Sequence, residues 1–291
     1  MKRVSFKREL LRRIPVLSRV ARALDALEEE NHALKAENRE LRKRIAQPVL
    51  LSTSKDVQAD PSELSEATGL PLPPAYLREW VAGTDDLHWF LEGGELGGQT
   101  ILSILAKHNI ELEKLESVLD FGCGCGRVIR HLHLYEAVRL HGTDCNQAAI
   151  AWCDENLNFA EFGTNPLEPP TRYRQHSFDL IYAFSVFTHL TESLQAAWMQ
   201  EMRRILKPQG LLIITVHGDY YLPQITLSEQ ARYQRGELVV TGEEAVGQNL
   251  CAAYHPEPYV RNILAKDFEV VGFFPQGALG NPKQDAYLLR T

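Results

Sequence analysis

The sequence of 291 residues contains no run of eighteen apolar residues, which is about the length a helix needs to cross a bilayer. It shows no secretory signal, because Lys and Arg interrupt the apolar residues near its N-terminus. Cysteine is scarce: there are five, an odd number, and no C-x-x-C pair. We therefore expect no membrane span, no disulfide framework and no metal site. A reducing cytoplasm is the expected location.

Charge is distributed unevenly, although the net formal charge is only −7. Residues 1–22 carry eight Lys and Arg against the single acid Glu9, a net charge of +7, which leaves −14 for the rest of the chain. A protein that binds RNA or DNA needs a basic face, so we expect no nucleic-acid partner. A basic head on an acidic body favours an electrostatic tether at the N-terminus.

The basic segment 1–22 also has an amphipathic pattern. Apolar and cationic residues interleave in the order Phe6, Lys7, Arg8, Leu10, Leu11, Arg12, Arg13, Ile14. This pattern is typical of a helix that lies in the interface of an anionic bilayer, and it predicts a peripheral contact with the inner face of the membrane. A solvated basic tail would have the same composition and is the alternative.

A heptad pattern follows through residues 10–45. Position a holds Leu10, Leu17, Leu24, Asn31, Asn38 and Ile45, and position d holds Val20, Leu27, Leu34 and Leu41. Asparagine at position a fixes the register and favours a parallel pair. We expect a helical coiled coil over 23–47 and a homodimer through residues 17–45. A single solvated helix is the alternative.

The chain becomes globular after a linker. Residues 48–75 are rich in Ser, Thr and Pro and predict the linker, and the domain extends over 76–291. Expected strands lie at 118–121, 139–144, 178–184, 211–216, 268–274 and 284–290, and expected helices at 128–132, 147–156, 192–206 and 258–266. Strands separated by helices predict an α/β fold with a doubly wound parallel sheet. The last two strands are separated only by a short loop, so they should pair antiparallel.

A glycine-rich turn follows the first expected strand, in the sequence Asp120-Phe-Gly-Cys-Gly-Cys-Gly-Arg127. Glycines let the chain pass closely under a ligand, and the amides of the next helix point at it. Asp144 ends the next strand, where a carboxylate can bind both hydroxyls of a ribose. These features predict a cofactor that contains a nucleoside. A tight turn without a ligand is the alternative.

Three segments resemble motifs of the class I S-adenosylmethionine-dependent methyltransferases, in the order and at the spacing of that family. They are residues 118–127, 177–190 and 203–212, and the similarity covers roughly 85–291. The resemblance implies a Rossmann-like, seven-stranded, doubly wound sheet with an antiparallel last strand, preceded here by the coiled coil. It also implies S-adenosyl-L-methionine as the cofactor. A dehydrogenase, the competing enzyme class, would have its third glycine one residue later.

The resemblance also implies which residues bind the cofactor. Along the methionine moiety it places Asp120, Gly122, Gly124 and Gly126, and on the ribose it places Asp144. Asn165 stands where the family usually has an aspartate beside the adenine, a departure that leaves this contact open. Phe184 ends the fourth expected strand, near the cofactor. Trp80, Trp89 and Phe90 precede the first strand and are either a lid or core residues.

Two histidines follow expected strands at the end where substrates bind: His189 after the fourth and His217 after the fifth. Each is a candidate catalytic residue, because a hydroxyl acceptor benefits from a general base. Packing is the alternative for His189, and contact with the substrate without a role as base is the alternative for His217. Residues 218–257, between the fifth strand and the helix expected at 258–266, contain several tyrosines. We expect them to form a substrate-side insertion.

The N-terminal head and coil loosely resemble bacterial proteins that assemble cell-surface polysaccharides. We therefore expect a glycan or related small-molecule acceptor, methylated on oxygen. N-methylation of a small amine is one alternative, and a noncatalytic scaffold that binds the cofactor is another. The fold itself does not select among these.

Overall fold

The computed structural model describes residues 68–247, 249–280 and 283–291. The expected amphipathic segment 1–22, the coiled coil 23–47, the homodimer segment 17–45 and most of the linker 48–75 lie outside the described residues. Over the described part of the chain, no helix combines the length and the apolar character needed to span a bilayer.

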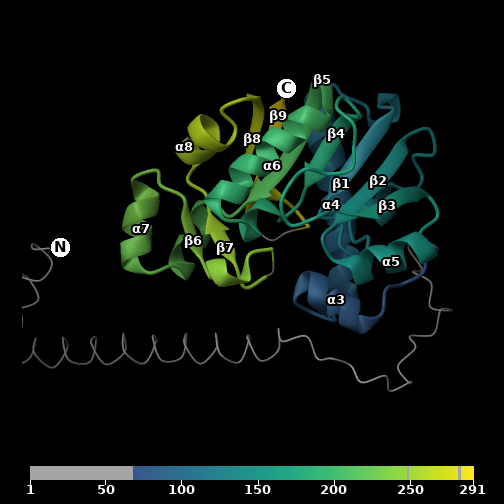
Figure 1. The fold of residues 1–291 in the computed structure, drawn as a ribbon, viewed down its shortest axis with the longest axis horizontal. Coiled ribbons are helices and arrows are strands. Elements are labelled where there is room, and N and C mark those ends of the chain that lie inside the picture. Colours follow the sequence, from purple (N-terminus) through teal and green to yellow (C-terminus); the bar gives the residue numbers. More distant parts are fainter. Residues whose placement is uncertain (1–67, 248, 281–282) are drawn as a thin grey trace, which may run out of the picture. The chain divides into compact units, whose positions relative to one another are not determined.

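One sheet of seven strands organises the described residues, in the order β3-β2-β1-β4-β5-β9-β8 (Figure 1). Its strands are β1 (Ser117–Phe121), β2 (Arg139–Asp144), β3 (Ala160–Thr164), β4 (Phe178–Ala183), β5 (Leu206–Val216), β8 (Glu269–Ala278) and β9 (Gln284–Arg290). The first five are parallel, and β9 runs antiparallel to both β5 and β8. The predicted Rossmann-like sheet with a reversed last strand is confirmed.

Helices cover both faces of this sheet. The α-helices of the described residues are α3 (Ala75–Ala82), α4 (Leu87–Lys107), α5 (Gln147–Asn156), α6 (Glu192–Ile205), α7 (Leu227–Gln234) and α8 (Glu257–Tyr259), of which α7 lies beside the sheet. Successive strand residues point to opposite faces, so β1 sends Val118 into a core with α4 and α5, and Leu119 into a core with α6. The strands are buried on both faces, which is why they read as continuous apolar runs.

Three segments differ from the sequence-based expectation. Residues 128–132 form only a 3-10 turn, Ile129–Leu132, in which Arg130 Nε donates to the Gly126 carbonyl oxygen at 3.2 Å. Residues 207–210, expected to end a helix, belong to an irregular start of β5, where the register with β4 shifts. The helix expected at 258–266 is the single turn α8 followed by a π-helix, Val260–Leu264.

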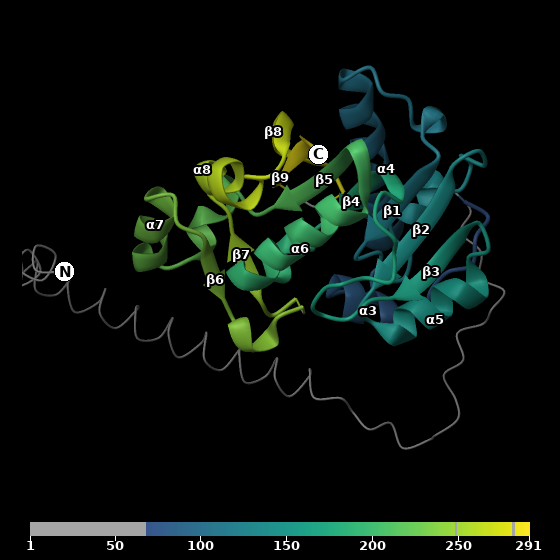
Figure 2. The same ribbon diagram turned by 45° about the horizontal axis from the view of Figure 1, so that its top comes forward.

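The segment between β5 and α8 forms a small unit beside the sheet. It contains the 3-10 turns Asp219–Gln224 and Glu243–Ala245, helix α7, and a hairpin of β6 (Val239–Thr241) and β7 (Ala252–Tyr254). Figures 1 and 2 both show this hairpin and α3 at the lower side of the view. They meet where the Asn249 side chain donates to the carbonyl oxygens of Trp80 and Val81, at 3.4 and 3.5 Å.

Candidate active site

The glycine turn connects the carboxyl end of β1 to β2. The N–H of Gly122 donates to the Thr143 carbonyl oxygen at 2.8 Å. Gly122 and Gly124 have φ angles of 80° and 54°, in the left-handed region that favours glycine. A Cβ on Gly122 would collide with Val186, and one on Gly124 with Val81. The turn therefore has no room for larger residues, and two valines lie directly over it.

The rest of the turn packs against the domain. Gly126 has a φ of 79°, and its N–H donates to the Cys123 carbonyl oxygen at 3.0 Å. Cys123 and Cys125 are buried, and burial raises the pKa of both thiols, that of Cys125 to about 12. They are therefore protonated packing residues at neutral pH. Among the residues that the structure describes, no group of His, Cys, Asp and Glu could hold a metal ion.

Asp144 ends β2 and faces the glycine turn. Its Oδ2 accepts the N–H of Gly124 at 2.9 Å, and its Oδ1 accepts the N–H of Asn146 at 2.8 Å. Burial raises the pKa of this carboxyl, and the two N–H bonds partly oppose that rise. Each carboxylate oxygen keeps another lone pair. The geometry therefore allows the two hydroxyls of a ribose to donate to Asp144.

Asp120, at the end of β1, is buried without full pairing. Its side chain is 3% exposed, and within the described residues its Oδ2 has no hydrogen-bond partner. Burial raises the pKa of Asp120 to about 8, against the lowering effects of the neighbouring Tyr182 hydroxyl and of the Arg127 guanidinium. A ligand with positive charge would stabilise the ionised form. S-adenosylmethionine carries an ammonium and a sulfonium group, so the turn and its two carboxyls fit this cofactor.

Asn165 and Phe184 lie at the same end of the sheet. Asn165 follows β3; its N–H donates to the Asp144 carbonyl oxygen at 3.1 Å, and its Oδ1 accepts the Thr143 hydroxyl at 2.9 Å. Phe184 follows β4, is 7% exposed, and has its ring 5.9 Å from that of Tyr182. Both are near the turn, and their contact with adenine or cofactor stays a prediction.

The two candidate histidines lie close together. His189 ends the 3-10 turn Phe187–His189 after β4, and its ring centroid is 6.5 Å from that of His217, which follows β5. His217 packs on Tyr221 and Tyr254, at 4.1 and 5.5 Å between ring centroids. The structure thus brings both histidines together with aromatic residues of the insertion.

Burial keeps these histidines neutral. It lowers the pKa of His189, and it lowers the pKa of His217 to about 4 with help from the neighbouring His189. His189 Nδ1 lies 2.7 Å from the Cys251 carbonyl oxygen. A carbonyl oxygen only accepts hydrogen bonds, so Nδ1 carries the hydrogen and Nε2 carries a free lone pair. His189 can therefore accept a proton at Nε2.

Local sequence patterns missed a buried polar network beside these histidines. Ser185 N donates to Thr215 Oγ1 at 2.8 Å, Thr215 Oγ1 donates to Gln284 Oε1 at 2.7 Å, and Gln284 Nε2 donates to Ser185 Oγ at 2.8 Å. This closed ring of bonds links the ends of β4, β5 and β9. Ser185 has a φ of 60°, so the network holds a strained residue next to the 3-10 turn that carries His189.

The three aromatic residues considered before β1 differ in burial. Phe90 is fully buried and packs with Leu77 of α3, whereas Trp80 is 62% exposed. Trp89 is half-buried under the Arg127 guanidinium, 5.1 Å from its ring centroid. Helix α3 therefore covers the glycine turn through Leu77 and Val81, while Trp80 faces outward.

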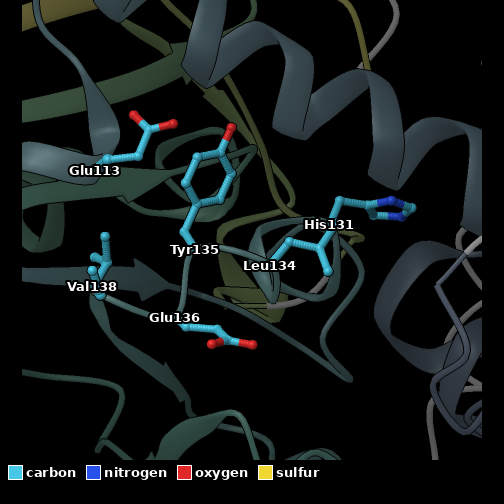
Figure 3. A pocket seen from close by; sticks show the side chains of 7 residues that line it. Glu113, His131, Leu134, Tyr135, Glu136 and Val138 are labelled. Atoms are coloured by element: carbon cyan, nitrogen blue, oxygen red, sulfur yellow. The ribbon is translucent and has the colours of Figure 1, made fainter.

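A cavity of about 490 Å³ lies elsewhere on the domain (Figure 3). The residues labelled around it are Glu113, His131, Leu134, Tyr135, Glu136 and Val138. They precede β1 and β2, at the amino ends of these parallel strands. The predicted site residues lie at the opposite, carboxyl ends, so this cavity is separate from the candidate active site.

Comparison with known proteins identifies the relatives of the domain. The family described as "Methyltransferase domain" matches residues 118–210, from β1 into β5. A phosphoethanolamine N-methyltransferase of Plasmodium falciparum (isolate 3D7) is 28% identical over 131 residues, which is 44% of this chain and 47% of that enzyme. The chain thus spans about half the length of this curated relative.

Solved structures are similar to the domain. An S-adenosylmethionine-dependent methyltransferase from Mesorhizobium loti is 16% identical, with a TM-score of 0.52 over 67% of this chain and 100% of that one. Another such enzyme, from Methanosarcina mazei, is 20% identical, with a TM-score of 0.49 over 64% of this chain and 96% of that one. At 16% identity, the similarity to the Mesorhizobium loti enzyme shows the fold alone.

Proposed function

We propose that this chain, which carries a class I S-adenosylmethionine-dependent methyltransferase domain with S-adenosylmethionine as its methyl donor, methylates an oxygen of a glycan or related small metabolite. The observation that carries the proposal is His189, neutral and with its Nε2 free, at the carboxyl ends of the strands beside the glycine turn. A hydroxyl acceptor becomes acidic as it is methylated, so it benefits from such a base.

The donor side of the site supports the proposal through charge and shape. When bound, S-adenosylmethionine supplies an electrophilic methyl group. Asp144 accepts the ribose hydroxyls and Asp120 compensates positive charge, while the glycines at 122 and 124 let Val186 and Val81 pack directly on the turn. Asn165 and Phe184 are proposed to contact the adenine side. Val81 and Val186 exclude water from the turn.

The acceptor side supplies the base and the surface that orients the substrate. Transfer requires donor and acceptor to be held in line at close range. Tyr221 and Tyr254 flank His217 and offer flat apolar surface to a sugar ring or a planar group. His189 Nε2 takes the proton of the hydroxyl, and Nδ1 keeps its bond to the Cys251 carbonyl oxygen. His217 is proposed to contact the acceptor.

N-methylation of a small amine is the second candidate. The observation in its favour is the similarity to an enzyme named as a phosphoethanolamine N-methyltransferase. A free amine carries its own nucleophilic lone pair and needs little more than positioning. Assays with hydroxyl and amine acceptors distinguish the two: replacing His189 by Ala should slow hydroxyl methylation much more than amine methylation.

A noncatalytic scaffold is the alternative of a different class, and cofactor binding by calorimetry tests against it. We expect S-adenosylmethionine to bind, and Asp144→Ala to weaken binding about 10- to 100-fold, because hydrogen bonds to a charged group contribute about 1.5–3 kcal/mol. Asp154→Ala, on the exposed face of α5, is the matched control and should bind like wild type. If wild type does not bind and Asp144→Ala behaves like it, the enzyme proposal is wrong.

The domain boundaries stay proposals, with a methyltransferase domain at 76–291 and a substrate-side insertion at 218–257. Residues 70–74 contact this domain, since Arg130 Nη2 donates to the Pro71 carbonyl oxygen at 2.8 Å. We also propose a homodimer through residues 17–45 and a peripheral membrane contact through 1–22. These would hold the enzyme in the cytoplasm at the inner face of the membrane. Both proposals rest on the sequence pattern of these segments.

A further inference from the structure

Gln195 is a fully buried polar residue on α6, among Trp198, Met199 and other apolar residues of that helix. Its side-chain Nε2 donates to the carbonyl oxygens of Phe187 and Leu190, at 3.1 and 3.0 Å. Phe187 is the first residue of the turn that carries His189, and Leu190 directly follows that turn. Because carbonyl oxygens only accept, the two bonds identify Nε2 and fix the orientation of the amide.

The other end of the amide meets a second histidine. Gln195 Oε1 lies 3.1 Å from Nε2 of His255, which is 1% exposed. An amide oxygen only accepts, so His255 Nε2 carries the hydrogen. Burial lowers the pKa of His255 to about 3, so its ring is neutral, and within the described residues its Nδ1 has no hydrogen-bond partner. Gln195 therefore selects the Nε2–H tautomer of His255.

His189 has the opposite tautomer. Its Nδ1–H donates to the Cys251 carbonyl oxygen, and its own carbonyl oxygen accepts the N–H of Gly247 at 2.8 Å. The hydrogen bond to Cys251, the residue before β7, therefore holds the ring. Gln195 of α6 holds the backbone of the same turn. Of the two ring nitrogens of His189, these contacts leave only Nε2 available to a substrate that is to be methylated.

We propose that Gln195 is a positioning residue that anchors the turn Phe187–His189 and holds His189 as the Nδ1–H tautomer with Nε2 available as the base. This inference rests on the proposed function. Gln195 makes three hydrogen bonds in a fully buried position, so each lost bond leaves a buried group without a partner. An apolar side chain of similar volume would fill the space but would free the turn.

Imidazole nitrogen NMR of the full chain tests this inference without an acceptor. With ¹⁵N-labelled histidine, long-range ¹H–¹⁵N spectra distinguish the two tautomers. We expect His189 as Nδ1–H and His255 as Nε2–H in wild type. In Gln195→Met, the His189 signals should shift toward a mixture of tautomers. Gln200→Met, on the exposed face of the same helix, is the matched control and should give the wild-type spectrum.

Gln195→Glu separates the two functions of the amide. A carboxyl group can accept from His255 Nε2, but it donates to neither carbonyl oxygen when ionised and to at most one of those of Phe187 and Leu190 when protonated, so at least one anchoring bond is lost. His255 should therefore keep its Nε2–H tautomer while His189 becomes mixed. The inference is overturned if wild-type His189 is the Nε2–H tautomer, or if a folded variant at Gln195 leaves the His189 signals unchanged.

Affinity for S-adenosylhomocysteine, measured by calorimetry, keeps this inference distinct from the proposed function. The variants at Gln195 should bind this probe within about two-fold of wild type, because the residue lies on the acceptor side. Failure of wild type to bind the probe would contradict the proposed function and leave the tautomer result standing. A loss of affinity larger than ten-fold in Gln195→Met alone would contradict a role confined to His189.

Discussion

Asp120 and Asp144 end neighbouring strands, yet their carboxylates have different partners. Asp144 accepts two backbone N–H groups, whereas the Oδ2 of Asp120 has no partner within the described residues. Burial raises the pKa of both, that of Asp120 to about 8. Without a ligand, an ionised Asp120 therefore destabilises the folded state. A bound cation would offset this destabilisation by stabilising the carboxylate.

Asp120→Asn should make stability less dependent on pH. The folded-state pKa of Asp120 is raised above its unfolded value near 4, so the folded state binds the extra proton and wild type loses stability as the pH rises from about 4 to about 8. The amide lacks this titration. We expect the variant to be more stable than wild type at pH 8 by more than about 1 kcal/mol, and the difference to shrink by pH 5.

Urea unfolding at pH 5 and pH 8, without cofactor, measures this difference. Asp154→Asn, on the exposed face of α5, should follow wild type at both values. Parallel behaviour of Asp120→Asn and wild type across the range would show that Asp120 does not titrate as its burial demands.

The sequence was informative about residues whose role depends on local spacing. The glycines, Asp120 and Asp144 could be predicted because a strand, a turn and the next strand bring them together. Ser185, Thr215 and Gln284 could not, because they meet only when β4, β5 and β9 pair. Gln195 is recognisable from the sequence as a polar residue on the buried face of α6, which it shares with Trp198 and Met202.

At the scale of elements, α4 shows how closely backbones approach next to the glycine turn. Four glycines of this helix, Gly93, Gly94, Gly97 and Gly98, are buried. A Cβ on Gly94 would collide with the carbonyl oxygen of Arg127, and a Cβ on Gly97 would lie 3.0 Å from Val128. The segment after the turn therefore packs directly on the backbone of α4.

Gly94→Ala should therefore destabilise the domain. The methyl group would meet backbone that cannot move away, at a cost of about 1–3 kcal/mol, against a gain of about 1 kcal/mol in helix propensity. Gly98→Ala is the matched control, because its Cβ would lie 3.3 Å from His131 Cβ and needs only a small adjustment. Urea midpoints should fall for the first variant and stay equal or rise for the second; equal midpoints would refute the close approach.

Element types were predictable where periodicity was strong and less so where tertiary contacts set the ends. The ranges of β2, α5 and β9 agree with the pattern of apolar residues. The segment after the glycine turn does not, because a 3-10 turn tied by Arg130 Nε to the Gly126 carbonyl oxygen at 3.2 Å takes the place of a helix. That bond depends on a buried arginine, which no local rule anticipates.

At the scale of the whole molecule, the division into an acidic domain and a basic N-terminal head leads to two separate predictions, one on dimerisation and one on membrane binding. By light scattering, we expect the full chain to have about twice its monomer mass of 33.0 kDa, and residues 68–291 to be a monomer.

In a vesicle flotation experiment, the full chain should float with anionic vesicles and residues 68–291 should not, while neutral vesicles recruit neither. Equal monomer masses would end the dimer proposal, and absence of the full chain from anionic vesicles would end the membrane contact.

The position of β9 between β5 and β8 has a consequence for the order of assembly. β8 precedes β9 in the chain, yet it reaches the sheet only through β9. The neighbouring pair β8 and β9 is antiparallel and close in sequence, so it can form early by local contacts, whereas pairing of β9 with β5 closes a loop of many residues. We therefore expect β8 and β9 to pair with each other before β9 pairs with β5.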